Sequence, residues 1–565
     1  DKKVKDRKLK NIITSEKSQF WKFISKNVYL NNERIELDKR LLANYYKDNG
    51  YYQVNVTNSF VEFKNDGSIK LIFNIDAGEK FTFNNLSLKL SNDYDPKYLI
   101  EIKDSLSKLE NKEYSLSKIE KVLREVDKIA LSKQYEFIDA SLTEKISNNN
   151  KLDISISLID TEKFYVERIN VLGNEFTLEE VIRNTFIVDE GDPYNEILFN
   201  KSINNLKSKN IFGSVKSNVL PGSNSNLKII DITVEEKPTG EISLGAGVGT
   251  SGGTIGGGIK ENNFLGKGIK LNTNLQFSEN AIKGIFVYEK PNFNYSDNTL
   301  LTSVRSTSED NLINFGYKTS EVGISFGTSF EQYENFYFSP QLNTSYEKLE
   351  TTNSASSNLK KQEGDYLDTY LNYSLIYDLR NKSYRPDEGF RNHFYQELPV
   401  ISDNYEIVNS FETSRYQKIA GLVTKINLYG KVVNTLNGDD VRISKRLYMP
   451  ANKLRGFESG KVGPIENNDF VGGNYVSAFN FSTTLPKLLP SLQNTDVSFF
   501  FDAANVWGVD YDSSLKDGSK IRSATGIGVD ILTPIGPLNF SLSQPITKSS
   551  TDVTETFRFN LGTTF

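Results

Sequence analysis

Apolar and polar positions alternate strictly in many short segments between about residue 240 and the C-terminus. In segment 269–277 the odd positions carry Ile, Leu, Thr, Leu and Phe, whereas the even positions carry Lys, Asn, Asn and Gln. Segments 422–432 and 557–565 show the same alternation. A period of two over about ten residues predicts β-strands with one apolar and one polar face. We therefore expect residues 238–565 to form one β-domain.

The composition of the polar face of these strands distinguishes a membrane barrel from a soluble β-sandwich. Strand after strand places Lys, Asn and Gln opposite its apolar side chains, which fits a wet lumen better than a dry core. At about 20 residues for each strand and its connection, this region gives about sixteen strands, an even number as such barrels use. Short turns at 385–389 and 533–537 suit the periplasmic side, and the polar segment 347–365 suits an external loop. The prediction is a transmembrane antiparallel β-barrel.

Residues 1–237 instead mix helical and strand patterns, and the mixture repeats. Three similar strings, Glu79-Lys80-Phe81, Glu162-Lys163-Phe164 and Glu236-Lys237-Pro238, each follow a strand at spacings of 162 − 79 = 83 and 236 − 162 = 74 residues. Such regular self-similarity indicates repeated small domains. We expect three α+β repeats at 1–79, 80–162 and 163–237. The first lacks an opening strand, so we expect the chain to be cut within a repeat, with further repeats upstream.

The third repeat shows the expected internal order most clearly. Its opening strand ends at Gly173-Asn174, and Thr177-Leu178-Glu179-Glu180 has the spacing of a capping box for a short helix. A second helix carries Ile197, Ile203 and Leu206 on about one face. Two strands complete the repeat. We predict strand–helix–helix–strand–strand units, each a small open sheet with its helices on one face.

Composition excludes several classes of site. The chain has no Cys and a single His, so disulfides and thiolate or imidazole metal sites are not expected, and a Ser-His-Asp triad would need His393. No Ser or Asp constellation is evident around His393, which we interpret as a surface or strand residue near a turn. A net charge of −5 gives no reason to expect nucleic acid, and we predict neither enzymatic activity nor a cofactor. The only Met is Met449, so the chain is expected to be a processed or truncated product.

Four stretches in order resemble the family of POTRA-plus-barrel assembly proteins of the outer membrane. They are RINVLGN…DEGDPYN…LKSKNIFGSV…VEEKPTG, then YDLRNKSYRPDEGF, then LRGFESGKVGP…VGGN, and finally FFFDAANVWG with GPLNFSLSQP and a last strand ending in Phe565. The resemblance implies an insertase of Gram-negative bacteria, with its barrel in the outer membrane lipid and its POTRA repeats in the periplasm. Its implied partners are unfolded β-barrel clients and periplasmic lipoprotein subunits of the assembly machinery.

An assembly factor of this kind needs a seam that opens, and the seam joins the first strand, Glu241–Thr250, to the last, Thr556–Phe565. Gly245, Gly247 and Gly249 weaken the first strand, because glycine lacks packing and loses entropy in a strand. The last strand carries Phe559, Gly562 and Phe565, and a bend at Gly562 would shorten the pairing. We predict a lateral gate whose edge templates the incoming strand. The alternative is that the glycines only relieve crowding.

The stretch KLRGFESGKVGP at 453–464 resembles a loop that folds back into the lumen, where its Arg meets an acidic residue on the wall. Here the candidates are Leu454, Arg455, Gly456 and Phe457 on the loop, with Asp502 on the wall. Since Phe499 and Phe501 share one parity, Asp502 faces the lumen if they face lipid. Ser482 stands where relatives often carry a second acidic partner, so we expect the clamp to rest on Asp502 alone, with Ser482 giving at most a neutral hydrogen bond. The alternative is a solvated loop arginine.

Other functions remain open at this point. The repeats present bare strand edges that could receive clients or accessory proteins, although a rigid spacer is an equal alternative. A polypeptide secretion pore, or a translocation-and-assembly factor of the same superfamily, would share both halves of the chain. A passive porin would share the barrel but needs no repeats. A passive porin would show ion conductance without any effect on barrel assembly, whereas the details of the third repeat and the closing strands argue against the secretion pore and the translocation-and-assembly factor.

Overall fold

A computed structural model describes most of the chain. The described residues are 3–10, 12–15, 32–63, 69–90, 100–132, 138–147, 150–160, 164–249, 252–353, 355–382, 385–419, 422–485, 495–515, 520–533 and 536–561. Their contacts divide the chain into two compact units. The first comprises residues 1–173, 185–208 and 212–235, and the second comprises 174–184, 209–211 and 236–565. Each unit is described by itself.

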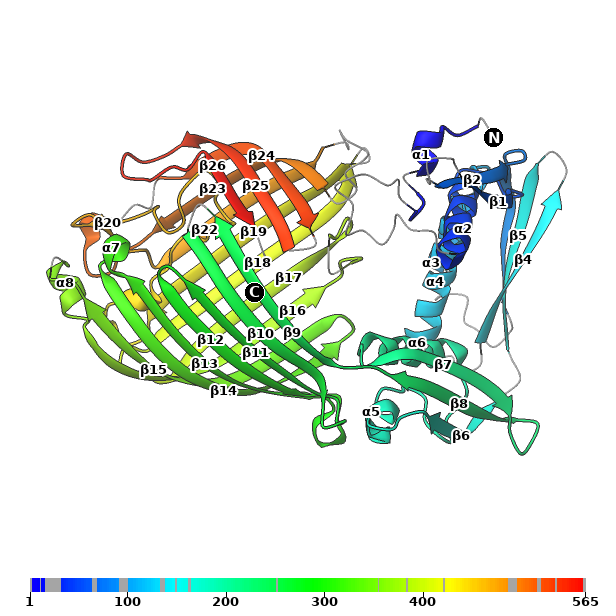
Figure 1. Ribbon diagram of the computed structural model, residues 1–565, viewed down its shortest axis with the longest axis horizontal. Helices are drawn as coiled ribbons and strands as arrows, with labels where there is room; N and C mark the ends of the chain where they lie inside the picture. Colours follow the sequence, from blue (N-terminus) through cyan, green and yellow to red (C-terminus); the bar gives the residue numbers. More distant parts are fainter. Residues whose placement is uncertain are drawn as a thin grey trace. The chain divides into compact units, whose positions relative to one another are not determined.

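The first unit contains the predicted α+β repeats (Figure 1). The described elements are α1 (Asp6–Lys10), α2 (Asn32–Asp48), β1 (Asn55–Phe63) and β2 (Ile69–Asp76); then β3 (Thr82–Leu90), α3 (Ile100–Ser107), α4 (Leu116–Ser132), β4 (Ile138–Ser147) and β5 (Lys151–Asp160); then β6 (Tyr165–Leu172), α6 (Glu196–Ser208), β7 (Phe212–Pro221) and β8 (Leu227–Glu236). Helix α5 (Glu179–Arg183), which belongs to the second unit, lies between β6 and α6 along the chain, so the third repeat has the predicted order of strand, two helices and two strands.

The second and third repeats share one sheet topology. Their described strands pair in the orders β3-β5-β4 and β6-β8-β7, so the last strand of each repeat lies in the centre. The opening strand pairs parallel to it, and β4 pairs with β5 antiparallel. In the second repeat, Phe83, Ile102 and Leu152 are fully buried where α3 and α4 pack on the sheet. This topology leaves β3 and β4 in one sheet, and β6 and β7 in the other, as edge strands.

The predicted capping box at Thr177 is wrong. Helix α5 begins at Glu179 with Leu178 as its N-cap and no side-chain cap. The Thr177 hydroxyl instead accepts a hydrogen bond from Asn263 Nδ2 at 2.9 Å, and both side chains are buried. The Thr177 amide donates to Glu236 Oε1 at 2.6 Å. These partners are distant in sequence, and they have replaced the local cap that the spacing suggested.

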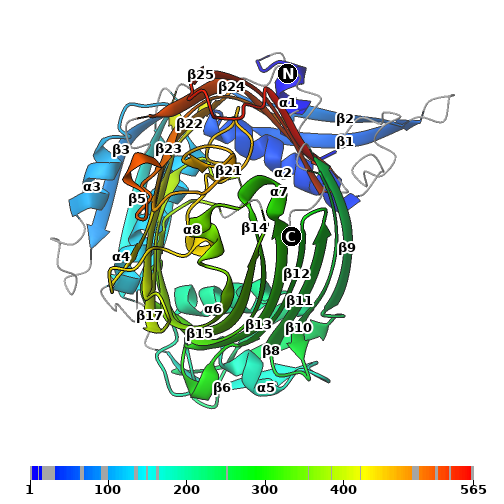
Figure 2. The same cartoon turned by 90° about the vertical axis from the view of Figure 1, so that its left-hand side faces the viewer.

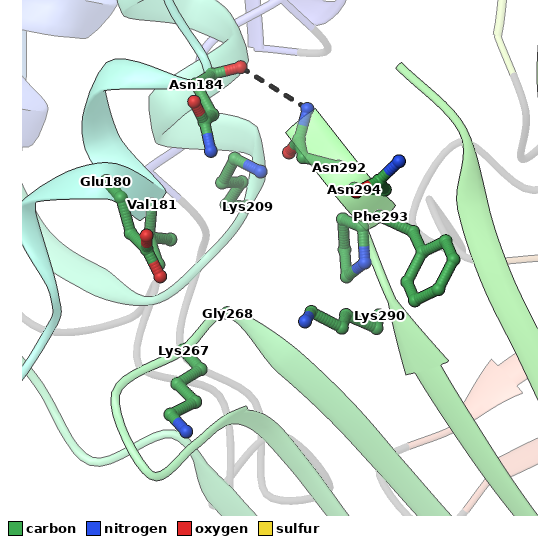
Figure 3. A pocket seen from close by; sticks show the side chains of 11 residues that line it. Glu180, Val181, Asn184, Lys209, Lys267, Gly268, Lys290, Asn292, Phe293 and Asn294 are labelled. Atoms are coloured by element: carbon green, nitrogen blue, oxygen red, sulfur yellow. Dashed lines mark hydrogen bonds between the residues drawn. The ribbon is translucent and has the colours of Figure 1, made fainter. Parts of the chain in front are cut away.

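A small cavity lies beside α5, within the second unit (Figure 3). Its volume is about 250 Å³, and its polar lining includes Lys209, Lys267, Lys290 and Glu180. The Asn292 side chain donates to the Asn184 carbonyl at 3.5 Å on one side. Burial, together with nearby Lys270, lowers the pKa of Lys209 from its ordinary value. The side chains that line the cavity therefore include both positive and negative charges, with lysines in the majority.

Within the described residues of the second unit, sixteen antiparallel strands close into a barrel, as predicted (Figures 1 and 2). They are β9 (Gly240–Gly249), β10 (Gly252–Phe264), β11 (Ile269–Ser278), β12 (Ala281–Lys290), β13 (Thr299–Asn311), β14 (Tyr317–Tyr333), β15 (Phe336–Thr351), β16 (Gly364–Asp378), β17 (Gly389–Ile401), β18 (Glu406–Ile419), β19 (Leu422–Thr435), β22 (Tyr475–Thr484), β23 (Thr495–Trp507), β24 (Arg522–Thr533), β25 (Gly536–Thr547) and β26 (Phe557–Leu561).

Shorter elements lie in the connections between these strands. They are η4 (Phe293–Tyr295), α7 (Leu312–Phe315), α8 (Ser357–Lys360), η5 (Ile443–Lys445), β20 (Ile465–Glu466), β21 (Asp469–Phe470) and η6 (Ser513–Leu515). The segment expected as an external loop thus contains α8, and β15 extends to Thr351 within it. Part of the expected turn at 533–537 lies outside the described residues.

The alternation seen in the sequence corresponds to the two faces of the barrel wall. Leu275 and Phe277 point outward and remain half exposed, as side chains facing lipid would be. Opposite faces carry buried polar groups such as Asn343, Asn427 and Asp502. Among the described helices, none is long and apolar enough to span a membrane.

Candidate functional site

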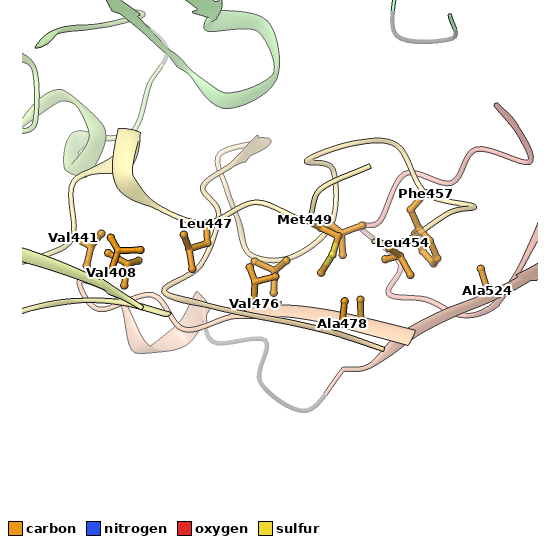
Figure 4. Packing of buried hydrophobic residues seen from close by; sticks show 13 residues of the cluster. Val408, Val441, Leu447, Met449, Leu454, Phe457, Val476, Ala478 and Ala524 are labelled. Carbon is orange, nitrogen blue, oxygen red and sulfur yellow. The ribbon is translucent and has the colours of Figure 1, made fainter. Parts of the chain in front are cut away.

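The connection from β19 to β22, residues 436–474, is here called the lumen loop. It packs on the inward faces of β18, β19, β22, β23 and β24 through a buried apolar cluster (Figure 4). Leu447, Met449, Leu454 and Phe457 are the loop side chains at its centre, and all four are buried. Outward residues of the same strands, such as Phe499, are exposed. The loop therefore lies inside the barrel.

Arg455, at the tip of the lumen loop, lies against Asp502 on β23. Its Nε donates to Asp502 Oδ2 at 2.8 Å, its Nη2 donates to Oδ1 at 2.8 Å, and its backbone N–H donates to Oδ2 at 3.1 Å. Asp502 has no exposed side-chain surface. A planar guanidinium that meets a carboxylate through two parallel bonds gives both strength and geometric specificity. The structure thus brings together the two residues that the sequence paired.

Two further wall residues complete this contact. Asn480 on β22 stands opposite Asp502 in the strand register and donates to Asp502 Oδ1 at 2.8 Å. The same amide donates to the Lys453 carbonyl at 2.7 Å, so it fixes the loop as well as the carboxylate. The Arg455 guanidinium stacks 3.5 Å from the ring centre of Phe500, which is fully buried. Phe500 was detectable in the sequence, because it shares the parity of Asp502.

Ser482, which was expected to give Arg455 at most a neutral hydrogen bond, lies beside this contact on β22. It pairs with Phe500 across β22 and β23, two residues from the Asn480–Asp502 pair. Among the described residues, the side-chain hydrogen bonds of Arg455 end on Asp502, and none joins it to Ser482. The second polar contact of the site is Asn480. Sequence alone could not show this, because it depends on the register between β22 and β23.

Gly456 and Phe457 determine how closely the loop approaches the wall. Gly456 has φ +90°, a region that side chains rarely adopt, and a Cβ there would lie 3.0 Å from Ala524 Cβ and 3.2 Å from Ser543 Cβ. Phe457 is buried and forms an isolated antiparallel bridge with Thr554. A residue larger than glycine would therefore force the tip away from β24 and β25.

The base of the lumen loop has a second anchor that the sequence did not reveal. Arg442 forms an ion pair with Asp368 on β16, and its Nε lies 3.5 Å from Glu347 Oε2 on β15 and 3.9 Å from Glu406 Oε1 on β18. All four side chains are buried. Arg446 further pairs with Asp510, and Lys453 with Glu412. The carboxylates come from several strands, so no local motif could identify them.

The first and last strands meet at the predicted seam. In the described residues their register comprises Asn560 with Gly249 and Leu561 with Val248. Gly562 and Phe565 lie outside the described residues, and Phe559 pairs with Phe540 on β25. Gly245 and Gly247 share one face of β9, whereas Ile242 and Leu244 on the other face are 80% and 88% exposed. The seam strand β9 thus presents little side-chain bulk to the lumen.

His393 lies within β17, where it pairs with Ile376 and Glu412. Ser374 Oγ lies 3.0 Å from His393 Nε2. Ser374 belongs to β16, and strand pairing brings the two side chains together. Among the described residues no cluster of three or more His, Cys, Asp or Glu side chains could hold a metal ion.

Residues 263–565, more than half of the chain, match the Omp85 superfamily domain. The chain belongs to the Omp85 superfamily. Residues 1–78 and 164–237 match the POTRA family, described as a surface antigen variable number repeat. The barrel and the two ends of the repeat region therefore both have the domain types of this superfamily.

Curated Omp85 relatives align over nearly the whole chain. The outer membrane protein assembly factor BamA of Neorickettsia risticii is 24% identical over 99% of this chain and 76% of its own length. BamA of Neisseria meningitidis serogroup B is 22% identical over the same shares. The crystal structure of BamA from Haemophilus ducreyi lacking POTRA domains 1–3 superposes with a TM-score of 0.64, at 21% identity, over 86% of this chain and all of that one. The superposition on the Haemophilus ducreyi structure shows similarity of fold.

Proposed function

We propose that this protein assembles and inserts β-barrel proteins into the bacterial outer membrane, with its POTRA repeats in the periplasm. Membership of the Omp85 superfamily and near full-length similarity to proteins named outer membrane protein assembly factors support this role. The partners that follow from it are unfolded β-barrel clients, periplasmic lipoprotein subunits and outer membrane lipid. The mechanism requires neither ATP nor a catalytic residue.

The finer part of the proposal is a lateral gate between β9 and β26. The observation that carries it is the meeting of the first and last strands at a seam in which β9 has a glycine-rich inner face. A barrel is stable in lipid because every backbone edge is paired, so opening this seam exposes an edge that an incoming strand can extend. Gly245, Gly247 and Gly249 lower the cost of opening, because glycine packs poorly in a strand.

The POTRA repeats have a related use for strand edges. In the second and third repeats the central strand is paired on both sides, whereas β3, β4, β6 and β7 each have one paired side within their described sheets. An extended peptide can add to such an edge through main-chain hydrogen bonds. We propose that these edges receive clients or accessory lipoproteins before the clients reach the seam.

A disulfide lock across the seam tests the gate. The chain has no native cysteine, so Gly249→Cys with Asn560→Cys introduces a single pair at register partners. A matched control, Ile242→Cys with Ile259→Cys, joins β9 to β10 and leaves the seam unlocked. We expect the oxidised seam pair to block folding of a β-barrel client into vesicles that contain the protein, and a reductant to restore it. Normal client insertion through a locked seam would refute the gate.

Depletion of the protein in cells tests the broader role. In depleted cells, other outer membrane barrel proteins should accumulate unassembled. Expression of the control variant, Ile242→Cys with Ile259→Cys, should restore their assembly. Ion conductance or polypeptide export that is lost without any defect in barrel assembly would instead favour a porin or a secretion pore.

A further inference from the structure

A second arginine points in the opposite direction, from the barrel wall into the lumen loop. Arg558 lies on β26, the last strand, and is 9% exposed. Its Nη1 donates to the Ala451 carbonyl at 2.7 Å, and its Nη2 donates to the Phe457 carbonyl. Its Nε donates to Glu555 Oε2 at 2.7 Å, which fixes the plane of the guanidinium. One side chain on the seam strand thus holds both sides of the loop tip.

The chain just before β26 makes backbone contacts with the same part of the loop. The amide of Glu458 donates to the Val553 carbonyl at 3.0 Å, and the amide of Glu555 donates to the Gly456 carbonyl at 3.0 Å. The Val553 amide donates to the Lys461 carbonyl at 3.2 Å. The start of the last strand is therefore hydrogen-bonded to the loop as well as to the neighbouring strand β25.

These contacts make the lumen loop a bridge between two parts of the barrel. Arg455 fixes the loop tip to Asp502 on β23, and Arg558 fixes the same tip to β26, with β24 and β25 lying between. Charge-assisted bonds between buried groups are stronger than neutral ones, and two on one guanidinium also define its orientation. Displacement of the loop must therefore break bonds to β26, which is a seam strand.

We propose that Arg558 is a positioning residue that couples the lumen loop to the last strand, so that the position of the loop controls how β26 pairs with β9. The role of this coupling in client insertion rests on the proposed lateral gate. The test of the coupling itself does not, because it measures only how the two strands pair. Coupling of this kind is reciprocal, so pairing at the seam must also hold the loop in place.

The rate of disulfide formation in the Gly249→Cys, Asn560→Cys protein measures seam pairing. Directly opposite residues of antiparallel strands have Cα atoms about 4.5–5.5 Å apart, within the range that a disulfide spans. In the folded barrel in lipid vesicles, Arg558→Gln should slow this reaction at least about threefold, because charge-assisted bonds to two carbonyls are lost. Arg558→Lys, which keeps a charged donor, should restore part of the rate.

The decisive comparison adds Arg455→Gln, a change on the loop that removes bonds to Asp502 on β23. The proposal predicts that Arg455→Gln also slows the seam disulfide, and that the double variant is no slower than the slower single variant, since both changes act through one loop. Arg305→Gln is the matched control. It removes a lumen arginine paired with Glu321 on a neighbouring strand, and it should leave the rate unchanged.

Three outcomes would overturn the coupling: an unchanged rate in Arg558→Gln, an unchanged rate in Arg455→Gln, or effects that multiply in the double variant. If the Gln variants fail to fold, the same cycle is run with Arg558→Lys and Arg455→Lys. Client insertion is measured in the same vesicles. Seam rates that follow the loop while insertion is unchanged would support the coupling and refute the gate, so the two proposals fail separately.

Discussion

Arg442 of the lumen loop and Asp368 of β16 form an ion pair in which each side chain is only 1% exposed. Glu347 and Glu406 lie on other sides of the same guanidinium, so one buried cation faces three buried carboxylates. The desolvation of these charges is costly, and Arg442 offsets it together with hydrogen bonds from Ser402 to Asp368 and from Tyr370 to Glu406. This anchor holds the base of the loop, whereas the Arg455–Asp502 pair holds its tip.

We predict that Arg442→Gln destabilises the barrel by about 3–5 kcal/mol, because removing one partner leaves uncompensated buried charge. Guanidinium unfolding of the refolded protein in vesicles, followed by tryptophan fluorescence, measures the change. Adding Glu406→Gln to this variant should recover part of the loss, since it removes one of the stranded carboxylates. A double variant less stable than Arg442→Gln alone would contradict this account.

Asp502→Ala and Arg455→Ala should each release the loop tip. Arg455→Ala leaves Asp502 buried, with Asn480 as the remaining side-chain donor among the described residues, and we expect the free energy of unfolding to fall by about 3 kcal/mol. Limited proteolysis of the folded barrel, with cleavage mapped to residues 451–464, measures the release. Ser482→Ala is the matched control on the same strand pair and should stay within about 0.5 kcal/mol of the parent protein. Protection of the loop in both alanine variants would exclude the clamp.

The sequence predicted the architecture because the signals for it are local and repeated. Alternation with a period of two survives in strand after strand, and the repeat spacing identifies the strand–helix–helix–strand–strand units. The capping box predicted from the T-x-x-E spacing at Thr177 was wrong, because the Thr177 hydroxyl is hydrogen-bonded to buried Asn263, far along the chain. Local propensity is a weak prior when a tertiary contact offers the same group a better bond.

The candidate site was predicted in part for the same reason. Parity along β23 placed Asp502 on the inner face, and the resemblance supplied its pairing with Arg455. Asn480 and Arg442 escaped prediction because their roles depend on strand register and on carboxylates from separate strands. Arg558 escaped because its partners are backbone carbonyls, which any sequence provides.

Gly456→Ala should displace the loop tip, through backbone strain and through a clash with the barrel wall. A second variant, Gly438→Ala, separates these two effects. Both glycines lie in the lumen loop with positive φ, +90° and +84°, so both alanine variants incur backbone strain of about 1–2 kcal/mol. Only Gly456 has close neighbours, Ala524 and Ser543, whereas the space around Gly438 is open. Gly456→Ala should therefore be the less stable variant in guanidinium unfolding. Equal losses would show that packing against the wall contributes little.

The last prediction concerns pH and the segment that carries α5. Glu236 accepts hydrogen bonds from the amides of Thr177 at 2.6 Å and Phe176 at 3.0 Å. Burial alone would raise the pKa of Glu236, but the bonds from Thr177 and Phe176 outweigh it and lower the pKa from its ordinary value of 4.5. Because the folded-state pKa is the lower one, ionisation favours the fold. The stabilisation is complete above the unfolded pKa and disappears as pH falls through the folded one.

Glu236→Gln should therefore weaken this segment at about pH 7 by about 1 kcal/mol, the usual net value of a hydrogen bond, and weaken it progressively less below about pH 4.5. Amide hydrogen exchange of residues 174–178 in the full chain, corrected for the intrinsic pH dependence, measures local opening. Glu235→Gln, an exposed neighbour bonded to Ser214, is the control and should leave this protection unchanged. A difference between the parent protein and Glu236→Gln that stays constant across this range would show that ionised Glu236 does not hold the segment.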